Sequence, residues 1–374
     1  MNILWFTWRD ITHPLAGGAE AQSSAHCKYL AAHGHTVTVL TSRYAGAKQI
    51  SLLDGYKIIR VGNRYTVYVA AAIYYLRHLR SWPKIIIEEV NTVPFLTQWY
   101  THPKKRFLYI YQLSRQIWFH EIFFPINIIG YLVEPIYLWI MRKNYVFTES
   151  QSTKEDLLRF GFKNDRIHII PIGISQEKKL TSDKVIGSQT KYKKPTILSF
   201  GAVRSMKRTL DQVRAFEIAK QSIPKLQMTI CGDTPWQYGK IVLRYIKNSP
   251  YTNDIQYLGR VDKKTKIDVM NHSHLILVTS VKEGWGMIVT EAGLHGTPAI
   301  VYDVDGLRDT VIDSKTGIIV KSNTPRALSK KIVNTLADKA KYNQLRQNAI
   351  RHSKKFTYNK ASKKLLSFIS HPSS

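Results

Sequence analysis

The chain has 374 residues, of which 44% are apolar and 22% are charged. Its length is about twice that of a typical domain, so we expect two domains, and its ordinary composition excludes wholesale disorder and a membrane protein with several spans. Lys and Arg exceed Asp and Glu by 29, and +20 of this net charge lies in residues 175–374. The excess predicts an acidic partner, for which nucleic acid, anionic phospholipid and phosphorylated small molecules are the candidates.

Targeting and redox signals are few. Cys27 and Cys231 are the only cysteines, and their separation favours neither a disulfide framework nor a zinc cluster, which fits a reducing cytoplasm. The N-terminus has no basic region before its short apolar run, so we expect no signal peptide. The most apolar stretch, residues 117–141, contains charged residues and two prolines. A bilayer span needs about 20 nearly uninterrupted apolar residues, so we expect no transmembrane helix.

Short apolar runs alternate with longer stretches of helical character, and this alternation predicts parallel sheets built from βαβ units. In the first half the runs are Ile3 to Thr7, Thr36 to Leu40, Ile85 to Ile87, Phe107 to Ile110 and Tyr145 to Thr148. In the second half they are Ile197 to Phe200, Gln227 to Cys231, Leu275 to Val278 and Ala299 to Tyr302. The sequence therefore predicts an α/β fold.

The domain boundary is predicted from composition. Residues 175–195 are rich in Lys, Ser and Thr and read as a linker between two Rossmann-like, doubly wound domains, residues 1–174 and 196–355. Such domains bind ligands at the carboxyl ends of their strands, so we expect a site assembled from both halves. Residues 356–374 are predicted to form a C-terminal helix or tail. The Lys-rich faces of the stretch from Arg351 to Lys364 favour a solvated amphipathic helix there.

The segment richest in chemistry is Ser280-Val-Lys-Glu-Gly-Trp-Gly-Met, directly after a predicted strand. Two glycines permit a tight turn before a predicted helix, so the backbone amides of Gly286, Met287 and Ile288 would form an anion site at the helix N-terminus. Glu283 would lie in the turn and Glu291 about one turn inside the helix. The alternative is a plain strand-turn-helix corner with one capping carboxylate.

A carboxylate pair is also typical of glycoside hydrolases, whose two groups flank one bond at about 5 to 9.5 Å. Were Glu283 and Glu291 both helical, their separation would be about 12 Å along the axis. This spacing favours a grip on different parts of one elongated ligand.

At this segment the chain resembles the retaining glycosyltransferases of family 4, which have the GT-B fold of two Rossmann-like domains facing across a cleft. The E-x7-E signature of that family matches Glu283 and Glu291, and the likeness continues through Gly296-Thr-Pro298 and the loop Val304-Asp-Gly-Leu307. The opening strand from Ile3 and the glycine loop Gly17-Gly-Ala-Glu20 also match. The resemblance covers nearly the whole chain.

The resemblance implies roles for these residues. Glu283 would accept hydrogen bonds from hydroxyls of the donor sugar, and Glu291 from the ribose of its nucleotide, which suits ionised carboxylates. The amides of Gly286, Met287 and Ile288 would bind the diphosphate and stabilise the charge that collects on it as the glycosidic bond breaks. No metal or other cofactor is then needed.

The predicted phosphate loop after Phe200 departs from the family pattern. Gly201 and Lys207 match the G-R-x-x-x-x-K motif, but Ala202 stands where the arginine belongs. Arg204 or Arg208 could reach the same phosphate, and a solvated basic loop is the alternative.

A second departure lies in the first domain. The resemblance implies a catalytic position for Tyr111, where relatives have a histidine near the sugar and acceptor. A phenol with a pKa near 10 is a poor proton acceptor at neutral pH. In the same domain Gly17 and Gly18 would let the backbone approach the donor or acceptor, or would form an ordinary turn before a helix.

Asp303-Val-Asp305 imitates the DxD metal motif of another glycosyltransferase fold. Family 4 uses this loop without a metal, and two carboxylates alone do not form a magnesium site. We therefore assign no metal ligand.

Two stretches are typical either of a membrane surface or of a buried helix in the first domain. Residues 64–82 mix Arg with aromatic and aliphatic side chains, and residues 118–139 are strongly apolar. With the net charge of +29, this predicts peripheral association with anionic lipid at the cytoplasmic membrane face.

The leading hypothesis is a retaining, metal-independent hexosyltransferase that uses a UDP- or GDP-linked sugar and a glycan or lipid-linked acceptor, as in the synthesis of cell-envelope polysaccharides. Ala202 and Tyr111 motivate an alternative, a catalytically weakened relative that binds a nucleotide sugar as a regulatory module. Nucleic-acid binding rests on charge alone, and no recognised motif supports it.

Overall fold

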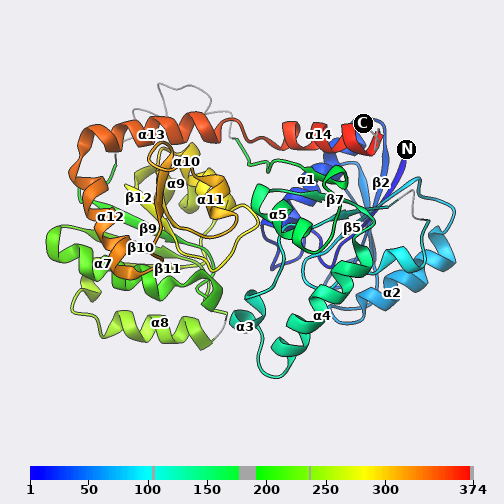
Figure 1. Ribbon diagram of the computed structural model, residues 1–374, viewed down its shortest axis with the longest axis horizontal. Coiled ribbons are helices and arrows are strands. Elements are labelled where there is room, and N and C mark those ends of the chain that lie inside the picture. Colours follow the sequence, from blue (N-terminus) through cyan, green and yellow to red (C-terminus); the bar gives the residue numbers. More distant parts are fainter. Residues whose placement is uncertain (103–105, 177–190, 236, 371–374) are drawn as a thin grey trace. The chain divides into compact units, whose positions relative to one another are not determined.

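The computed structural model describes residues 1–102, 106–176, 191–235 and 237–370. These form two compact units, each a sheet with helices on both faces (Figure 1). The N-terminal unit holds the described parts of residues 1–115, 129–173 and 357–374, and the C-terminal unit holds those of 116–128 and 174–356. The prediction of two doubly wound α/β domains is confirmed.

The units divide the chain differently from the prediction in two places. Residues 116–128 group with the C-terminal unit, and the residues from 357 onward group with the N-terminal one. Most of the predicted linker, residues 177–190, lies outside the described residues.

The N-terminal sheet has the order β3-β4-β2-β1-β5-β6-β7-β8 and is parallel except for the β3-β4 pair. Its strands are β1 (Asn2–Phe6), β2 (Thr36–Thr41), β3 (Ile50–Leu53), β4 (Tyr56–Arg60), β5 (Ile85–Glu89), β6 (Arg106–Tyr109), β7 (Tyr145–Thr148) and β8 (Ile167–Ile169). All five strands predicted in this half are present. β3, β4 and β8 were not predicted.

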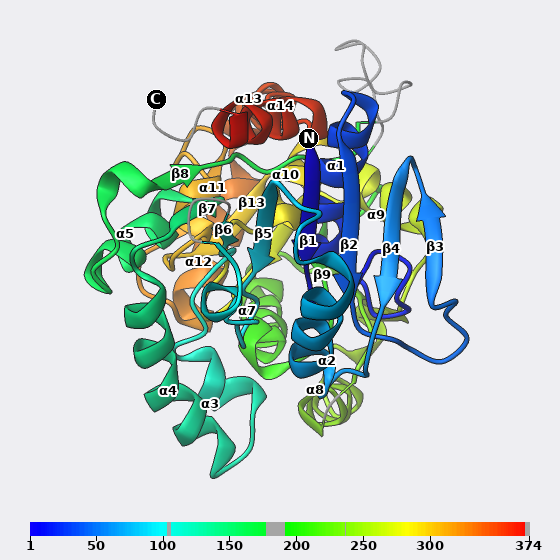
Figure 2. The same cartoon turned by 90° about the vertical axis from the view of Figure 1, so that its right-hand side faces the viewer.

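Alternate side chains of this sheet face two helical layers. Trp5 packs toward a layer formed by α1 (Gly18–Ala32) and α14 (Tyr358–Ser370). Leu4 and Leu108 face the opposite layer. That layer contains α2 (Val67–Tyr74), the π-helix η1 (Tyr75–Leu79), α4 (Ile126–Met141) and α5 (Gln151–Arg159). Figure 2 shows α1 and α14 on one side of the strands and α2 and α4 on the other. The described part of the unit also contains the 3-10 turns η2 (Thr97–Trp99) and η4 (Asn164–Arg166).

The C-terminal helix corrects one prediction. Instead of a solvated helix, α14 packs on α1 and buries Ala361, Leu365 and Ile369, each at most 2% exposed. The Ser362 hydroxyl also lies 2.8 Å from Nδ1 of the buried His26 on α1. The Lys-rich faces of the sequence described the outer side of this helix correctly, but nothing local in the sequence indicated its distant partner.

The C-terminal sheet is parallel throughout and has the order β11-β10-β9-β12-β13-β14. Its strands are β9 (Thr196–Phe200), β10 (Gln227–Cys231), β11 (Ile255–Gly259), β12 (Leu275–Val278), β13 (Ala299–Tyr302) and β14 (Gly317–Val320). The four strands predicted here are confirmed, and β11 and β14 were not predicted.

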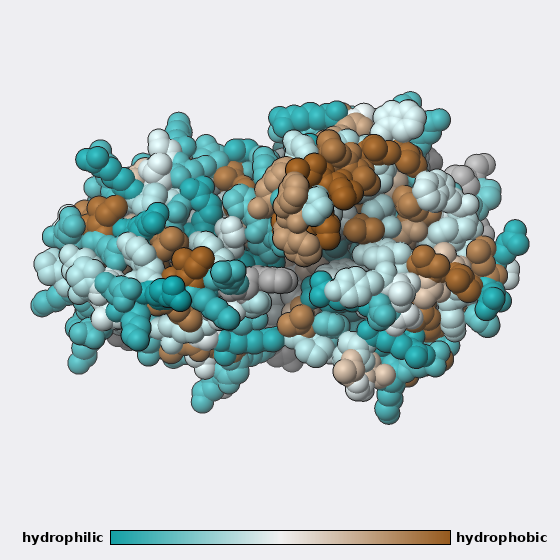
Figure 3. Space-filling view, turned by 90° about the horizontal axis from the view of Figure 1, so that it is seen from below, coloured by the Kyte–Doolittle hydropathy of each residue, from teal (hydrophilic) through white to brown (hydrophobic). Residues whose placement is uncertain are grey.

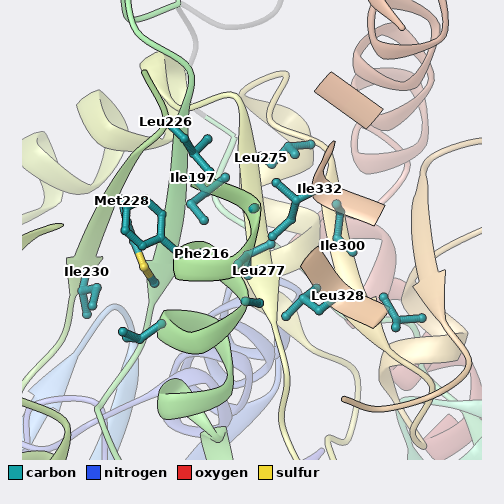
Figure 4. Close-up of a cluster of buried hydrophobic side chains, with 14 of the residues drawn as sticks. Ile197, Phe216, Leu226, Met228, Ile230, Leu275, Leu277, Ile300, Leu328 and Ile332 are labelled. Atoms are coloured by element: carbon teal, nitrogen blue, oxygen red, sulfur yellow. The ribbon is translucent and has the colours of Figure 1, made fainter. Parts of the chain in front are cut away.

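Helices cover both faces of this second sheet. One face packs on α7 (Thr209–Ser222), α8 (Gln237–Lys247) and α12 (Pro325–Ala337), and Figure 4 shows Phe216, Leu328 and Ile332 against strand residues there. The other face packs on α9 (Lys263–His272), α10 (Met287–Leu294) and α11 (Leu307–Thr310). α13 (Lys339–Ser353) lies against α10 and α12. Among the described residues this unit also contains α3 (Ile117–Glu121), η6 (Ser205–Lys207) and η7 (Thr252–Asp254).

Each sheet has a point where the strand order reverses. In the C-terminal unit the chain runs from β9 through β10 to β11 on one side, and then returns to place β12 on the other side of β9. In the N-terminal unit β1 and β5 are the corresponding neighbours. Loops diverge at the carboxyl ends of such strand pairs, and ligands of open α/β sheets bind there.

No helix among the described residues is long and apolar enough to cross a membrane.

Candidate functional site

The loops that follow β9 and β12 are tied together at the reversal point of the C-terminal sheet. The amide of Val281 donates to the carbonyl of Met206 at 2.8 Å, and the hydroxyl of Thr279 donates to the carbonyl of Lys207 at 2.8 Å. These hydrogen bonds to backbone carbonyls hold the two loops together and so place Lys207 and Glu283 near each other.

Lys207 and Glu283 form an ion pair across these two loops. The Ser280 hydroxyl donates to Oε1 of Glu283 at 2.6 Å, and the glutamate side chain is 14% exposed. Burial alone would raise the pKa of Glu283. The charge of Lys207 and the hydrogen bonds from Lys207 and Ser280 outweigh burial and hold the pKa below its ordinary value. Glu283 is thus an oriented, ionised hydrogen-bond acceptor.

The loop after β13 contacts the backbone of Glu283. The amide of Glu283 donates to the carbonyl of Asp305 at 3.1 Å, and Gly306 has a φ of +78°. A Cβ on Gly306 would lie 2.1 Å from the carbonyl oxygen of Glu283, so only glycine permits this approach. Asp303 and Asp305 are paired with Arg308 at 2.8 and 2.7 Å. These two carboxylates of the DxD-like sequence therefore serve an ion pair.

The turn after Glu283 leads into α10, as the glycines predicted. Gly286 is the N-cap residue with a φ of +83°, and a Cβ there would meet Leu307 Cδ2 at 2.7 Å. Since glycine has no side chain, the N-cap itself places nothing in front of the first turn, where Met287 and Ile288 begin the helix. The positive end of the helix dipole favours an anion at this position.

Glu291 lies on α10 and is paired with Lys266 of α9. Their Oε2 and Nζ atoms are 2.8 Å apart, and both side chains are partly exposed, at 25% and 29%. The ammonium of Lys266 also lies 5.5 Å from the ring centroid of Phe200, at the carboxyl end of β9. The second glutamate of the E-x7-E signature is therefore at the same sheet edge as the first.

Gly201 and Ala202 begin the loop after β9. Gly201 has a φ of +133°, and its carbonyl approaches Gly232 so closely that a Cβ on Gly232 would lie 1.9 Å away. The positive φ explains the glycine of the motif at position 201, and the close approach explains the glycine at position 232. Ala202 has no side-chain hydrogen-bond donor, so it cannot replace the arginine of the family motif.

The two arginines of the same loop are bound by carboxylates. Arg204 Nη1 donates to Oε2 of Glu121 at 3.3 Å, and the other oxygen of Glu121 accepts from the amide of Met206 at 3.3 Å. Arg208 pairs with Asp211 at 2.7 Å. Both arginines remain about one third exposed, so a phosphate would compete with these carboxylates for them.

In the N-terminal unit Gly17 is the N-cap residue of α1. Its amide donates to Oε2 of Glu20 at 2.7 Å, and Arg9 binds the other oxygen at 3.0 Å. The φ of Gly17 is −130°, which any residue adopts, so the backbone itself does not demand glycine. The role predicted for Gly17 and Gly18 stays a prediction.

Tyr111 is buried in the N-terminal unit, at 8% exposure. Its hydroxyl donates to the carbonyl of Ala19 at 3.2 Å and lies 3.3 Å from Oε1 of Glu89. Burial, followed by the charge of Glu89, raises the pKa of Tyr111 well above its ordinary value. The phenol is a hydrogen-bond donor in this position, and its predicted catalytic role stays a prediction.

Sequence reasoning missed three partners of the predicted residues: Glu121, Lys266 and Glu89. Glu121 lies 83 residues from Arg204 in sequence, and Glu89 lies 22 residues from Tyr111. Ser280, three residues before Glu283, and Asp211, three residues after Arg208, could have been found from local spacing.

The C-terminal site thus combines acceptors and donors on one sheet edge. Ionised carboxylates accept hydrogen bonds from hydroxyls, and Lys207 and the start of α10 favour anionic oxygens. The arrangement suits a ligand that carries hydroxyl groups at both ends of an anionic centre.

Comparisons with known proteins cover both halves of the chain. The family model described as Glycosyltransferase Family 4 matches residues 16–178, and the one described as Glycosyl transferases group 1 matches residues 182–352. Trehalose synthase from Thermococcus litoralis is 25% identical over 191 residues, which are 47% of this chain and 45% of that protein. The D-inositol 3-phosphate glycosyltransferase from Xylanimonas cellulosilytica is 25% identical over 223 residues, 57% of this chain and 53% of that protein. The chain thus spans about half the length of these curated relatives.

Solved structures share the fold over the full length. Sucrose-phosphate synthase from Thermosynechococcus elongatus superposes with a TM-score of 0.77 at 18% identity and covers 99% of this chain and 98% of its own. Anabaena HepE, solved in complex with UDP and glucose, gives a TM-score of 0.73 at 17% identity over 99% of each chain. The fold is therefore that of the GT-B glycosyltransferases.

Proposed function

We propose that this chain, which belongs to glycosyltransferase family 4, transfers a hexose from a nucleotide-diphosphate sugar to a glycan or lipid-linked acceptor. The observation that carries the proposal is the ion pair of Lys207 and Glu283 at the reversal point of the C-terminal sheet, beside the start of α10. A nucleotide sugar has hydroxyls at both ends and a diphosphate between them, and the site offers partners of the matching kind.

In this proposal the diphosphate lies against Lys207 and the N-terminus of α10. Glu283 accepts hydrogen bonds from hydroxyls of the sugar, and Glu291 accepts them from the ribose. Lys207 would then be shared between Glu283 and the phosphate. As the bond to the anomeric carbon breaks, negative charge grows on the departing diphosphate, and a fixed ammonium nearby stabilises that charge more than it stabilises the ground state.

We further propose that transfer retains the anomeric configuration and needs no metal ion. With retention, the departing phosphate can accept the proton of the acceptor hydroxyl, so the enzyme itself needs no strong base at the position of Tyr111. Lys207 supplies the positive charge that a metal ion would otherwise bring to the diphosphate.

The relatives support the substrate class only in general terms. One is named for trehalose and another for an inositol phosphate, and HepE was solved with UDP and glucose. For this chain we propose a UDP- or GDP-linked sugar as the donor. We also propose that transfer takes place at the cytoplasmic face of the membrane.

Ala202 favours a second candidate, a nucleotide-sugar-binding protein with weakened transfer. The loop lacks the arginine donor, and Arg204 and Arg208 are already bound by Glu121 and Asp211. One charge-assisted hydrogen bond contributes about 1.5 to 3 kcal/mol, or about 10 to 100-fold in rate if it acts only in the transition state.

Turnover with a panel of UDP- and GDP-sugars tests the proposal, with sugar or alcohol acceptors and NMR of the product. We expect transfer with one donor class, a product with the donor's anomeric configuration, and no loss of rate in EDTA. An inverted product, or a rate that depends on added metal, would contradict the mechanism. Transfer that appears only in the Ala202→Arg variant would favour the binding protein instead.

A further inference from the structure

One helix of the N-terminal unit is apolar on both of its sides. α4 turns Glu134, Leu138 and Met141 toward the protein interior, where each is at most 1% exposed. Its opposite side carries an exposed apolar stripe at helical spacing, consisting of Ile129, Leu132, Val133, Ile136 and Trp139. A helix that is hydrophobic all round normally lies in a protein core or in contact with lipid.

The exposure of this stripe is large. Leu132 is 61% exposed, Ile136 58% and Trp139 60%. Figure 3 shows a broad hydrophobic area on this face of the molecule. Soluble proteins rarely expose contiguous apolar patches of this kind unless the patch binds a partner.

A second apolar stripe lies on the same helical layer. α2 and η1 cover the same side of the N-terminal sheet as α4, and they expose Val69, Ile73 and Leu76. The loop after β5 contacts both helices, because the Tyr137 hydroxyl of α4 donates to the carbonyl of Thr92 at 2.8 Å and the ring of Tyr68 of α2 lies 4.8 Å from that of Phe95. We call the exposed residues of the two stripes the α2-α4 surface.

The charges on α2, on η1 and its flanking residues and at the end of α4 are of one sign. Residues 55–87 contain no Asp or Glu, and Arg64, Arg77 and Arg80 are exposed. At the end of α4, Arg142 stacks on Trp139 at 3.9 Å and Lys143 is exposed.

The lone carboxylate of α4, Glu134, points away from this surface. It accepts hydrogen bonds from the amides of Ser114 and Arg115 at 2.6 and 2.7 Å. The surface therefore combines apolar side chains and Trp with Arg and Lys at its rim, without exposed acids on α4.

We propose that the α2-α4 surface docks this protein on an anionic phospholipid bilayer, with α4 lying in the interface. Basic residues at the rim match the negative surface of such a bilayer, and Arg and Lys can extend to the headgroups while the apolar stripe enters the acyl region. α4 has 16 residues and is too short to span the hydrocarbon core, which agrees with a position in the interface. The inference rests on the proposed function and deepens it, since it names the surface that meets a membrane-bound acceptor.

Vesicle sedimentation of the full chain tests this proposal. Two vesicle preparations are compared, phosphatidylcholine alone and phosphatidylcholine with phosphatidylglycerol, at low and high salt. We expect the protein to sediment with the anionic vesicles and to bind more weakly at high salt and on neutral vesicles.

Leu132→Glu with Ile136→Glu places two charges in the stripe and should weaken binding to anionic vesicles at least about tenfold. Both side chains are exposed, so the fold should tolerate the change. Ile241→Glu is the matched control, because Ile241 is 51% exposed on α8 in the other unit. Arg77→Glu with Arg80→Glu should reduce binding to anionic vesicles and leave binding to neutral ones unchanged.

Equal vesicle binding by the Leu132 and Ile136 variant and by the control would overturn the proposal, as would no binding of the unchanged protein. Sedimentation velocity without lipid gives a further outcome. A dimer that the double variant dissociates would assign the surface to a second copy of the chain and overturn the lipid assignment.

Nucleotide-sugar affinity in the same preparations separates this inference from the proposed function. The stripe variants should keep that affinity, so lost vesicle binding with intact donor binding concerns the surface alone. Failure of every preparation to bind a nucleotide sugar would count against the proposed function, whatever the vesicles show.

Discussion

Glutamates lie near the carboxyl ends of the strands in both units, but their ion pairing and burial differ between the two units. In the C-terminal unit Glu283 and Glu291 each pair with a lysine and stay partly exposed. In the N-terminal unit Glu89 and Glu149 are buried, at 1% and 4% exposure, and neither has a Lys or Arg side chain as an ion-pair partner among the described residues. The same side chain is paired with a lysine in one unit and is buried without such a partner in the other.

The pKa directions follow from this difference. Burial raises the pKa of Glu89 to about 7, although hydrogen bonds from Thr7 and Trp5 oppose it. Burial, together with the nearby Glu89, raises the pKa of Glu149 to about 8. For Glu283 the lysine reverses the effect of burial. A neighbouring cation, more than depth, therefore decides the charge of these carboxyl groups.

The largest expected effect comes from removing the cation of the C-terminal pair. Lys207→Ala should lower kcat/KM for sugar transfer about 10 to 100-fold, because it removes a charge-assisted contact to the departing diphosphate. Steady-state kinetics with the donor identified in the turnover panel measure the change. Lys225→Ala, at an exposed lysine of the same unit, is the control. Equal kinetics of the two variants would show that Lys207 does not contact the reacting groups.

A second prediction concerns the pH dependence of the free energy of unfolding that Glu89 of the N-terminal unit causes. The folded pKa of Glu89 lies above its unfolded value, so its favourable contribution is complete below about pH 4.5 and is lost as the pH rises through about 7. Between pH 5 and pH 8 this loss is about 2 to 3 kcal/mol. From pH 5 to pH 8 the free energy of unfolding of the Glu89→Gln variant should therefore fall by about 2 to 3 kcal/mol less than that of the unchanged protein.

Urea denaturation at the two pH values measures that difference. Glu155→Gln, at an exposed glutamate of α5, should behave as the unchanged protein does. If Glu89→Gln keeps the full pH dependence, then Glu89 is ionised in the folded protein and the contrast between the units fails.

The smallest effect is expected at Tyr111. Tyr111→Phe removes the hydroxyl that reaches Ala19 and Glu89 and should cost about 1 kcal/mol of stability. Thermal denaturation and steady-state kinetics together assign its role. A stability change alone would make it a positioning residue for Glu89, whereas a fall in kcat without a change in stability would support the catalytic role that the family resemblance implies.

Local pattern predicted most of what positions the C-terminal site. The apolar run from Leu275 to Val278 is β12 to the residue, and the glycines after it form the turn into α10. The strands that were missed are edge or next-to-edge strands. β3 and β4 form a hairpin whose turn at Asp54 and Gly55 is a recognisable signal, but the strands themselves are short.

What the sequence could not predict depends on contacts between distant residues. The burial that lifts the pKa of Glu149 comes from packing, and the partners of Arg204 and Glu291 lie on separate helices. In the same way, the apolar run around α4 was compatible with both a buried helix and an exposed one. The structure shows which side of the helix faces the sheet.

Calorimetric titration of UDP- and GDP-sugars tests the central claim, that the carboxylates and lysine at the reversal point of the C-terminal sheet bind a nucleotide sugar. The unchanged protein should bind one of the two donor classes, and Glu291→Ala should weaken that binding about tenfold or more, since a charged acceptor for the ribose hydroxyls is lost. Glu155→Ala should bind as tightly as the unchanged protein. The same affinity in Glu291→Ala and in the unchanged protein would contradict the account.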